Sequence, residues 1–189
     1  MPAMNPIELS TPRLTLRWMN QDDAEAHFAV FSDPEVVRYL GRGPWTDPAQ
    51  AVEAIGKTLA NYASGEGLRM GITLRDGGRL IGDASLFHFD DANRRCEIGY
   101  SLARAHWGQG YASEALEALL GYGFETLGLN RVEADIDPLN AGSGRVLEKL
   151  GFRREGYMPE RWIVDGVTAD TAFYGLLRSY WLNHGPARR

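Results

Sequence analysis

The chain has 189 residues, a hydrophobic content of 44%, 22 glycines and a formal net charge of −5. That length suits one domain whose core is stable without disulfides or a structural metal, and the composition excludes collagen-like repeats and a coiled coil. The single cysteine, Cys96, excludes an intramolecular disulfide and a multi-cysteine metal cluster, and the acidic balance without a basic stripe argues against a nucleic-acid partner.

The sequence carries no sign of export or of membrane insertion. Its first residues lack a basic stretch followed by an apolar one, and no run approaches the ~20 apolar residues of a membrane helix. The four histidines fall at no spacing typical of metal ligands. We therefore expect a cytoplasmic protein with no metal and no membrane partner, present as a monomer or a homodimer.

The first part of the chain predicts one strand and three helices. Alternation indicates a strand over residues 13–18. Asp22 or Asp23 is expected to cap the helix that follows, and a second short helix should run over residues 34–39. A third helix should begin at Asp47-Pro48, because proline suits a first turn. Its apolar spacing predicts one buried stripe, made of Val52, Ile55, Leu59 and Tyr62.

The rest of the chain predicts strands interrupted by two helices. Tight turns are expected at Asp76-Gly77-Gly78 and at Asp165-Gly166, where glycine supplies positive φ. Strands are expected over residues 70–74, 80–87, 96–102, 131–137, 152–164 and 169–177, and helices over residues 108–127 and 140–150. This order of elements indicates an α+β fold rather than a regular β-α-β repeat.

The clearest chemical signal lies between Cys96 and Leu116. A predicted strand leads into the short loop Gly108-Gln109-Gly110, which opens a helix. Such a helix start offers free backbone N–H groups and the positive end of the helix dipole, and glycine lacks the Cβ that would keep an anion away. The pattern therefore predicts a phosphate-binding site.

Two common nucleotide-binding motifs are excluded at this loop. A P-loop ends in Gly-Lys-Ser/Thr, a tripeptide that the chain lacks, and a dinucleotide fingerprint needs a third glycine where Ser113 stands. A lone Gly-x-Gly is equally compatible with a glycine-rich helix start that has no function.

Two further patterns favour a functional loop over a glycine-rich helix start that has no function. Gly99 interrupts a predicted strand, which suggests a bulge or the close approach of a ligand. One element after the next strand comes the run Asn140-Ala-Gly-Ser143-Gly-Arg145-Val-Leu-Glu-Lys149-Leu-Gly-Phe152. With these features the sequence resembles the GNAT superfamily of acyl-CoA-dependent N-acetyltransferases and, more narrowly, the ribosomal-protein N-terminal (Rim-type) acetyltransferases.

Both ends of the chain are similar to the Rim-type branch as well. The opening run is Leu9-Ser-Thr-Pro-Arg-Leu-Thr-Leu-Arg17, and the closing run is Val164-Asp-Gly166 followed by Asp170. The resemblance implies a single GNAT domain over residues 7–182 between tails at 1–6 and 183–189. It implies a central mixed, mostly antiparallel, splayed sheet flanked by helices.

The resemblance implies acetyl-CoA as the cosubstrate and assigns residues to it. Backbone amides of the loop would bind the pyrophosphate, and the preceding strand would pair its backbone with the pantetheine amides, like an added strand. Asn140 and Ser143 would lie near the thioester, and Arg145 or Lys149 would reach the adenosine phosphate. The strand contributes Ile98, Gly99, Tyr100, Ser101 and Leu102, and the loop contributes His106, Trp107, Gly108, Gln109, Gly110, Tyr111, Ala112 and Ser113.

Two residues are candidates for the catalytic chemistry. Glu97 is the leading general base, acting directly or through a water, although a solvated glutamate or an ion pair with arginine would also explain it. At the position where many superfamily members carry a tyrosine that acts as general acid, this chain has Leu147. Either Ser143 replaces that tyrosine or no acid is used, since a thiol with a pKa of ~8.5 leaves readily as thiolate. Helix capping explains Ser143 equally well.

Several other side chains are weaker candidates. Asp83 is expected on a strand that flanks the substrate cleft, although a solvated aspartate is the commoner case, and Cys96 is expected to be a core thiol. Four aromatic residues are candidates for the wall of the acceptor site, although core packing is the commoner role of such residues: Trp18, Trp45, Tyr157 and Tyr174.

The pKa of the acceptor amine decides how much the enzyme must help with its deprotonation. At pH 7 an α-amine with a pKa of ~8 is about 10% neutral, whereas a lysine-like amine with a pKa of ~10.4 is about 0.04% neutral, a difference of about 3.3 kcal/mol. The sequence leaves three functions open: a protein N-terminal acetyltransferase, a small-molecule amine acetyltransferase, and a catalytically quiet acyl-CoA-binding or interaction module.

Overall fold

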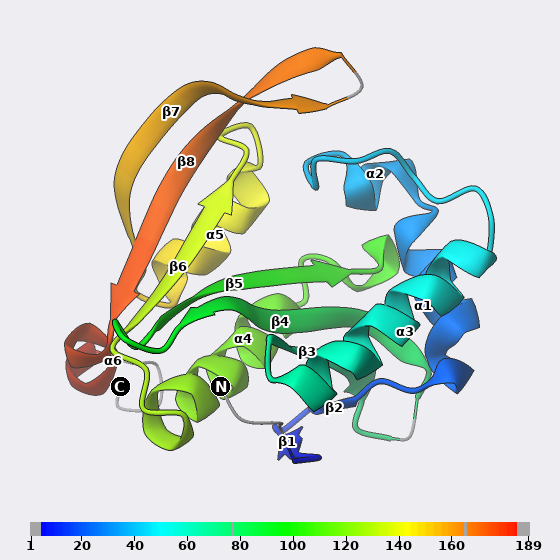
Figure 1. Ribbon diagram of the computed structural model, residues 1–189, viewed down its shortest axis with the longest axis horizontal. Helices are drawn as coiled ribbons and strands as arrows, with labels where there is room; N and C mark the ends of the chain where they lie inside the picture. The colour runs from blue at the N-terminus through cyan, green and yellow to red at the C-terminus, as the bar shows by residue number, and fades with distance from the viewer. Residues whose placement is uncertain (1–4, 77, 165, 185–189) are drawn as a thin grey trace.

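The computed structural model describes residues 5–76, 78–164 and 166–184. Within them lies one eight-stranded sheet with the strand order β1-β2-β3-β4-β5-β6-β8-β7 (Figure 1). All neighbouring strands are antiparallel except β5 and β6. The strands are β1 (Glu8–Ser10), β2 (Leu14–Trp18), β3 (Gly67–Leu74), β4 (Leu80–Asp90), β5 (Arg95–Leu102), β6 (Arg131–Ile136), β7 (Arg153–Val164) and β8 (Val167–Leu177).

Helices cover both faces of this sheet. The helices are α1 (Ala24–Phe31), α2 (Pro34–Val37), α3 (Ala49–Ser64), α4 (Tyr111–Gly121), α5 (Ala141–Lys149) and α6 (Arg178–His184). Helices α1 and α3 pack on β4 and β3 on one face, and α4 packs on the other face, where it contacts α5 (Figure 1). No helix among the described residues is both long and apolar enough to cross a bilayer.

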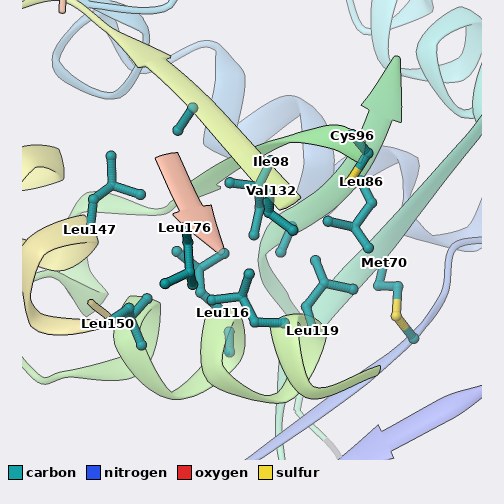
Figure 2. Packing of buried hydrophobic residues seen from close by; sticks show 14 of the residues in the cluster. Met70, Leu86, Cys96, Ile98, Leu116, Leu119, Val132, Leu147, Leu150 and Leu176 are labelled. Carbon is teal, nitrogen blue, oxygen red and sulfur yellow. The ribbon is translucent and has the colours of Figure 1, made fainter. Parts of the chain in front are cut away.

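The main core lies between the sheet and the helices α4 and α5 (Figure 2). Leu116 and Leu119 of α4 are fully buried with Leu86 and Val132 of the sheet. Each such side chain contributes roughly 1.5–3 kcal/mol when it leaves water. Cys96 is fully buried in the same cluster, so it is the core thiol that the sequence predicts.

The sheet splits between its two parallel strands. The strands β5 and β6 pair only from Arg95 to Glu97, opposite Arg131 to Glu133. Beyond Glu97 the strands diverge, and β6 turns away with the long β7–β8 hairpin (Figure 1). The predicted α+β fold with a mixed, mostly antiparallel, splayed sheet is confirmed. The divergence leaves the edge of residues 98–102 that faces β6 without a neighbouring strand.

The buried stripe predicted for α3 is partly wrong. Its buried residues are Ala51, Ile55, Thr58 and Tyr62, whereas Val52 and Leu59 are 49% and 38% exposed. Small Ala51 and Thr58 let the helix approach its neighbours closely, which turns the larger aliphatic residues outward.

Two other local expectations are corrected as well. Asp23 occupies the N-cap position of α1, as expected, but makes no side-chain capping bond to that helix. Asn20 caps the preceding 3₁₀ turn Gln21–Asp23, and Asp23 completes a capping box with it while binding Arg17. Gly99 makes no bulge, because the β4–β5 register runs without interruption from Leu102 to Glu97. A Cβ at Gly99 would lie 3.2 Å from Cε1 of Phe87, so this neighbouring ring crowds the position and favours glycine.

The chain ends require one further adjustment. Helix α6 was not expected, and it includes Asn183 and His184 of the predicted C-terminal tail. Gly77 and Asp165 of the predicted tight turns lie outside the described residues, as do residues 1–4 and 185–189 of the predicted tails.

Candidate active site

The loop before α4 presents backbone N–H groups that have no hydrogen-bond acceptor among the described residues. Gly108 and Gly110 have φ angles of +72° and +81°, a region that glycine adopts without strain. In the described part of the chain, no N–H group of residues 108–113 donates a hydrogen bond. A Cβ on Gly108 would meet nothing within 4 Å, so the space in front of the loop is open. Free donors at a helix N-terminus fit a pyrophosphate.

Arg13 and Glu114 fasten this loop to the sheet. The Arg13 guanidinium donates to the carbonyl of Gln109 over 2.9 Å and, through Nε, to Glu114 Oε2 over 2.6 Å. Thr11 Oγ1 donates to the other oxygen of Glu114 over 2.6 Å. No sequence pattern indicated this anchor, although Thr11 and Arg13 belong to the opening run that is similar to the Rim-type branch.

The side chains of the loop are held by the loop itself. Trp107 Nε1 donates to the carbonyl of Leu102 over 2.8 Å, and Gln109 Nε2 donates to that of Ala105 over 2.9 Å. The Tyr111 ring lies beneath the Arg13 guanidinium at 4.5 Å. Side-chain contacts thus fix the loop and leave its amides free. The remaining predicted loop residues flank the glycines, with His106 in a 3₁₀ turn and Ala112 and Ser113 in the first turn of α4.

Strand β5 carries its residues to two different faces. Ile98 and Leu102 are buried in the core. Gly99 and Ser101 lie opposite Ser85 and Asp83 of β4, on the other face of the sheet. The strand therefore places a backbone edge and a polar face next to the split in the sheet.

A hydroxyl pair connects β5 to α5. Tyr100 Oη lies 2.8 Å from Ser143 Oγ, and burial raises the pKa of Tyr100 to about 12 although the bond to Ser143 lowers it. Asn140 caps α5 by accepting from the Ser143 N–H over 3.1 Å. Capping therefore belongs to Asn140, and the Ser143 hydroxyl is left to Tyr100. Leu147, at the position where many superfamily members have tyrosine, is fully buried.

Glu97 sits where β5 and β6 begin to separate. It lies opposite Phe87 of β4, and its side chain is 30% exposed. Its Oε1 is 3.2 Å from Nδ1 of His88, a residue with a φ of +51°. The carboxylate is thus oriented by a histidine rather than by the arginine that the sequence left open.

Asp83 is buried, which contradicts the commoner case of a solvated aspartate. It is 4% exposed, accepts from Ser101 Oγ over 3.0 Å and lies 3.0 Å from His27 Nε2. Burial alone raises the pKa of Asp83, but the charge of Arg69 and these hydrogen bonds outweigh it and lower the pKa overall. The alternation of β4 indicated a strand but could not indicate partners that lie 18 and 56 positions away.

A cleft of about 1190 Å³ opens over this polar face. Its floor is made by β4 and β5, and its walls come from the chain after α2 and from the β7–β8 hairpin. A second cavity of about 410 Å³ adjoins it below α3. Residues that line both spaces are Arg42, Arg69, Ser85 and Phe87.

The remaining predicted residues fall in three places. Arg145 and Lys149 are exposed on α5. Tyr157 lines the cleft, and its hydroxyl donates to Asp170, whereas Trp45 lines the second cavity. Trp18 stacks on Tyr62 at 3.9 Å, and Tyr174 is buried near Glu148, so these two aromatic residues lie outside the cleft lining.

Comparison with known proteins agrees with this geometry. A family model described as an acetyltransferase (GNAT) domain matches residues 13–153. The chain belongs to the GNAT acetyltransferase family. Members of this family are acetyl-CoA-dependent N-acetyltransferases, and the chain is one of them.

Individual relatives cover nearly the whole chain. An uncharacterized N-acetyltransferase, p20 of Bacillus licheniformis, is 39% identical over 90% of this chain and 96% of its own. The [ribosomal protein uS5]-alanine N-acetyltransferase of Escherichia coli is 26% identical over 93% of both chains. A crystal structure of a GNAT-family acetyltransferase from Bacillus anthracis matches 92% of this chain and 99% of its own, with a TM-score of 0.82 and 29% identity. The Rim-type resemblance is thereby supported.

Proposed function

We propose that the chain transfers the acetyl group of acetyl-CoA directly to a primary amine held in the cleft. The observation that carries the proposal is the conjunction of free loop amides at α4 with an unpaired edge of β5. An extended acyl-CoA needs an anion site at one end and a strand-like edge along its length. Acetyl-CoA supplies an acetyl group activated as a thioester.

The chain binds the carrier largely through its backbone. The N–H groups of residues 108–113 bind the pyrophosphate, and the edge of residues 98–102 pairs with the pantetheine amides. Arg145 and Lys149, both exposed on α5, reach the adenosine phosphate. Asn140 contributes by capping α5, which holds Ser143 in position.

Glu97 acts as the general base. A nitrogen–carbon bond forms as the carbon–sulfur bond breaks, and the amine proton passes to the Glu97 carboxylate directly or through a water. His88 orients that carboxylate from 3.2 Å. Glu97 is the last residue of β5 that pairs with β6, so it lies where the carrier and the acceptor meet.

Ser143 and Tyr100 assist the departure of the thiol. Because its pKa of about 12 keeps Tyr100 protonated at neutral pH, this phenol can supply a proton through the Ser143 hydroxyl 2.8 Å away. A thiolate is a good leaving group even without a proton, so this contribution is smaller than that of the base.

The acceptor is an α-amine of a protein N-terminus or a small-molecule amine. An α-amine demands about 3.3 kcal/mol less help with deprotonation than a lysine-like amine. The relative that acetylates the alanine of ribosomal protein uS5 supports the first possibility. The second cavity beside the cleft supports the second.

The test is a thiol-release assay with acetyl-CoA and a panel of amines, with products identified by mass spectrometry. The panel contains peptides with a free N-terminus, the same peptides with an acetylated N-terminus, amino acids and diamines. We expect turnover with free amines and none with the blocked peptides. CoA binding in calorimetry without turnover on any amine would instead support a catalytically quiet acyl-CoA-binding module.

A further inference from the structure

One corner of the cleft carries more positive charge than the transfer reaction needs. Arg42 and Arg69 line both the cleft and the adjoining cavity of about 410 Å³. Ser85 and Phe87 of β4 are the other two residues that the two spaces share. The corner therefore lies on the same strand that faces Gly99 and Glu97 of β5.

Arg42 is held in place without a carboxylate. Its guanidinium lies 4.3 Å from the Phe31 ring centroid and 4.8 Å from that of Trp45. Among the described residues it has neither a hydrogen bond nor an ion pair. Partial burial lowers the pKa of Arg42 and the charge of Arg69 lowers it further, whereas the charge of Asp83 raises it without outweighing them.

The neighbouring charges do not neutralise this corner. Arg69 Nε is 3.9 Å from Asp83 Oδ2, and Asp83 is already engaged by His27 and Ser101. Lys57, a third cation at the cavity wall, is paired with Glu53 over 2.6 Å. Two guanidinium groups thus face a single, shared carboxylate.

The distance from this corner to the transfer point is short. Arg69 of β3 lies opposite Ser85 of β4, which lies opposite Gly99 of β5. Neighbouring strands are about 4.8 Å apart, so Arg69 and Gly99 are about 10 Å apart at the backbone. A long arginine side chain covers part of that distance. An anion bound here would lie only a few bonds from an amine placed above Gly99.

The opposite wall of the cleft has the complementary charge. It is lined by Asp135, Asp137, Glu160 and Asp170. A cleft with cationic and anionic walls suits an acceptor that carries both an ammonium and an anionic group. A polyamine, which carries only positive charge, would be repelled by the Arg42 side.

We infer that Arg42 and Arg69 bind a carboxylate carried by the acceptor, a few bonds from the amine that is acetylated. The inference rests on the proposed amine acetylation in this cleft and names its substrate class. The acceptor is an amino carboxylic acid, either free or as an acidic residue at the start of a peptide. Arginine provides paired donors that match a planar carboxylate, which makes it the preferred residue for this recognition.

The test compares acceptors that differ only in a carboxylate or a carboxamide. Turnover by the full chain is measured on an amino acid and its amide, and on peptides with Asp or Asn as the first residue. The ratio of kcat/KM between acid and amide is compared among proteins, because this cancels the difference in amine basicity. Arg42→Gln is expected to lower that ratio about 10- to 100-fold, as for loss of a charge-assisted hydrogen bond, and Arg69→Gln should lower it as well.

Lys57→Gln is the matched control, since Lys57 lines the same cavity but is already paired with Glu53. It should leave the ratio unchanged, and Arg42→Lys should recover part of the preference. A ratio that Arg42→Gln and Arg69→Gln leave unaltered would overturn the inference while leaving amine acetylation intact. The free and peptide arms distinguish the two sources of the carboxylate.

A binding measurement keeps the inference testable if turnover is absent. Calorimetry compares an N-acetylated amino acid with its N-acetylated amide on the wild-type protein saturated with CoA. Tighter binding of the acid that Arg42→Gln abolishes supports the carboxylate site even if the proposed function fails. Equal binding of the two compounds to the wild-type protein contradicts it.

Discussion

The loop proposed to bind the carrier and the corner proposed to bind the acceptor are built in opposite ways. The loop is a contiguous run before α4 that presents backbone groups, and its Trp107 and Gln109 side chains donate to nearby carbonyls that hold it. The corner is assembled from α1, the chain after α2, β3 and β4, and it presents side chains. A backbone site tolerates many substitutions, whereas a side-chain site changes its ligand with one. A substitution at the corner is therefore expected to change the acceptor without changing the carrier.

Glu97 lies at the boundary between the two regions. Its replacement should therefore separate catalysis from carrier binding more strongly than any other substitution. Glu97→Gln keeps the size but removes the proton acceptor, and the rate should fall by about 10²–10⁴-fold. The loss should shrink at high pH, where the amine deprotonates unaided, and should be larger for a lysine-like amine than for an α-amine. A pH profile of kcat/KM measures both effects.

The affinity for CoA provides the internal control for this variant. The affinity should hardly change, because the contact proposed for β5 is through the backbone. Glu66→Gln, at an exposed glutamate away from the cleft, should leave the profile unaltered. Superimposable profiles for Glu97→Gln and wild type would assign the proton to Ser143, to a water or to self-ionisation of the substrate.

Gly110→Glu should break the carrier site alone. The φ of +81° disfavours any residue with a Cβ, and a Cβ there would lie 3.4 Å from Nη2 of the anchoring Arg13. The added carboxylate would also bring negative charge beside the amides proposed to bind the pyrophosphate. A like-charge contact of about 4 kcal/mol would weaken CoA binding about 10³-fold in calorimetry. Gly128→Glu is the matched control, because Gly128 has a φ of +69° and lies at the far end of the helical segment that α4 begins. If both variants bind CoA equally, the loop is not the pyrophosphate site.

The contrast between the two regions also explains what the sequence could predict. Gly108, Gly110 and the strand before them are neighbours in the chain, so local rules identify the anion site. Asp83 gains its role from His27 and Ser101, which only the folded sheet brings together. Arg42 is a loop residue by sequence and gains its position from Phe31 and Trp45. The stripe of α3 was mispredicted for the same reason, since the close packing at Ala51 is a tertiary property.

Asp83, on the strand β4 that forms part of the cleft floor, should contribute to the pH dependence of the protein's stability in acid. Its pKa is lowered from the ordinary value of 3.8, so the folded state holds a proton there less readily than the unfolded chain. The stabilisation is present above that ordinary value and is lost as the pH falls through the lower, folded-state pKa. Asp83→Asn should cost about 1–3 kcal/mol at pH 7 and flatten the decline below about pH 4. Urea unfolding across this pH range tests both effects, with exposed Asp22→Asn as the control. An unchanged slope would show that Asp83 does not contribute to the acid transition.

The smallest expected effect concerns the anchor of the loop. Arg13 is 46% exposed on its side chain, so its bonds to Gln109 and Glu114 are partly screened by water. Arg13→Gln should weaken CoA binding about 5-fold, because the loop amides lose their fixed orientation and the Glu114 carboxylate loses its partner. Arg75→Gln is the control, since Arg75 donates to Thr11 in the same segment but does not touch the loop.

A double variant decides which of those two causes dominates at the anchor. Glu114 lies in the first turn of α4, beside the free amides, and Arg13 neutralises it. If the unmasked carboxylate repels the pyrophosphate, adding Glu114→Gln to Arg13→Gln should restore most of the affinity. If orientation of the loop is the main contribution, the double variant should bind CoA no better than Arg13→Gln, because Gln109 still lacks its donor. Calorimetry at two salt concentrations separates the cases, since repulsion weakens at high salt and loss of orientation does not.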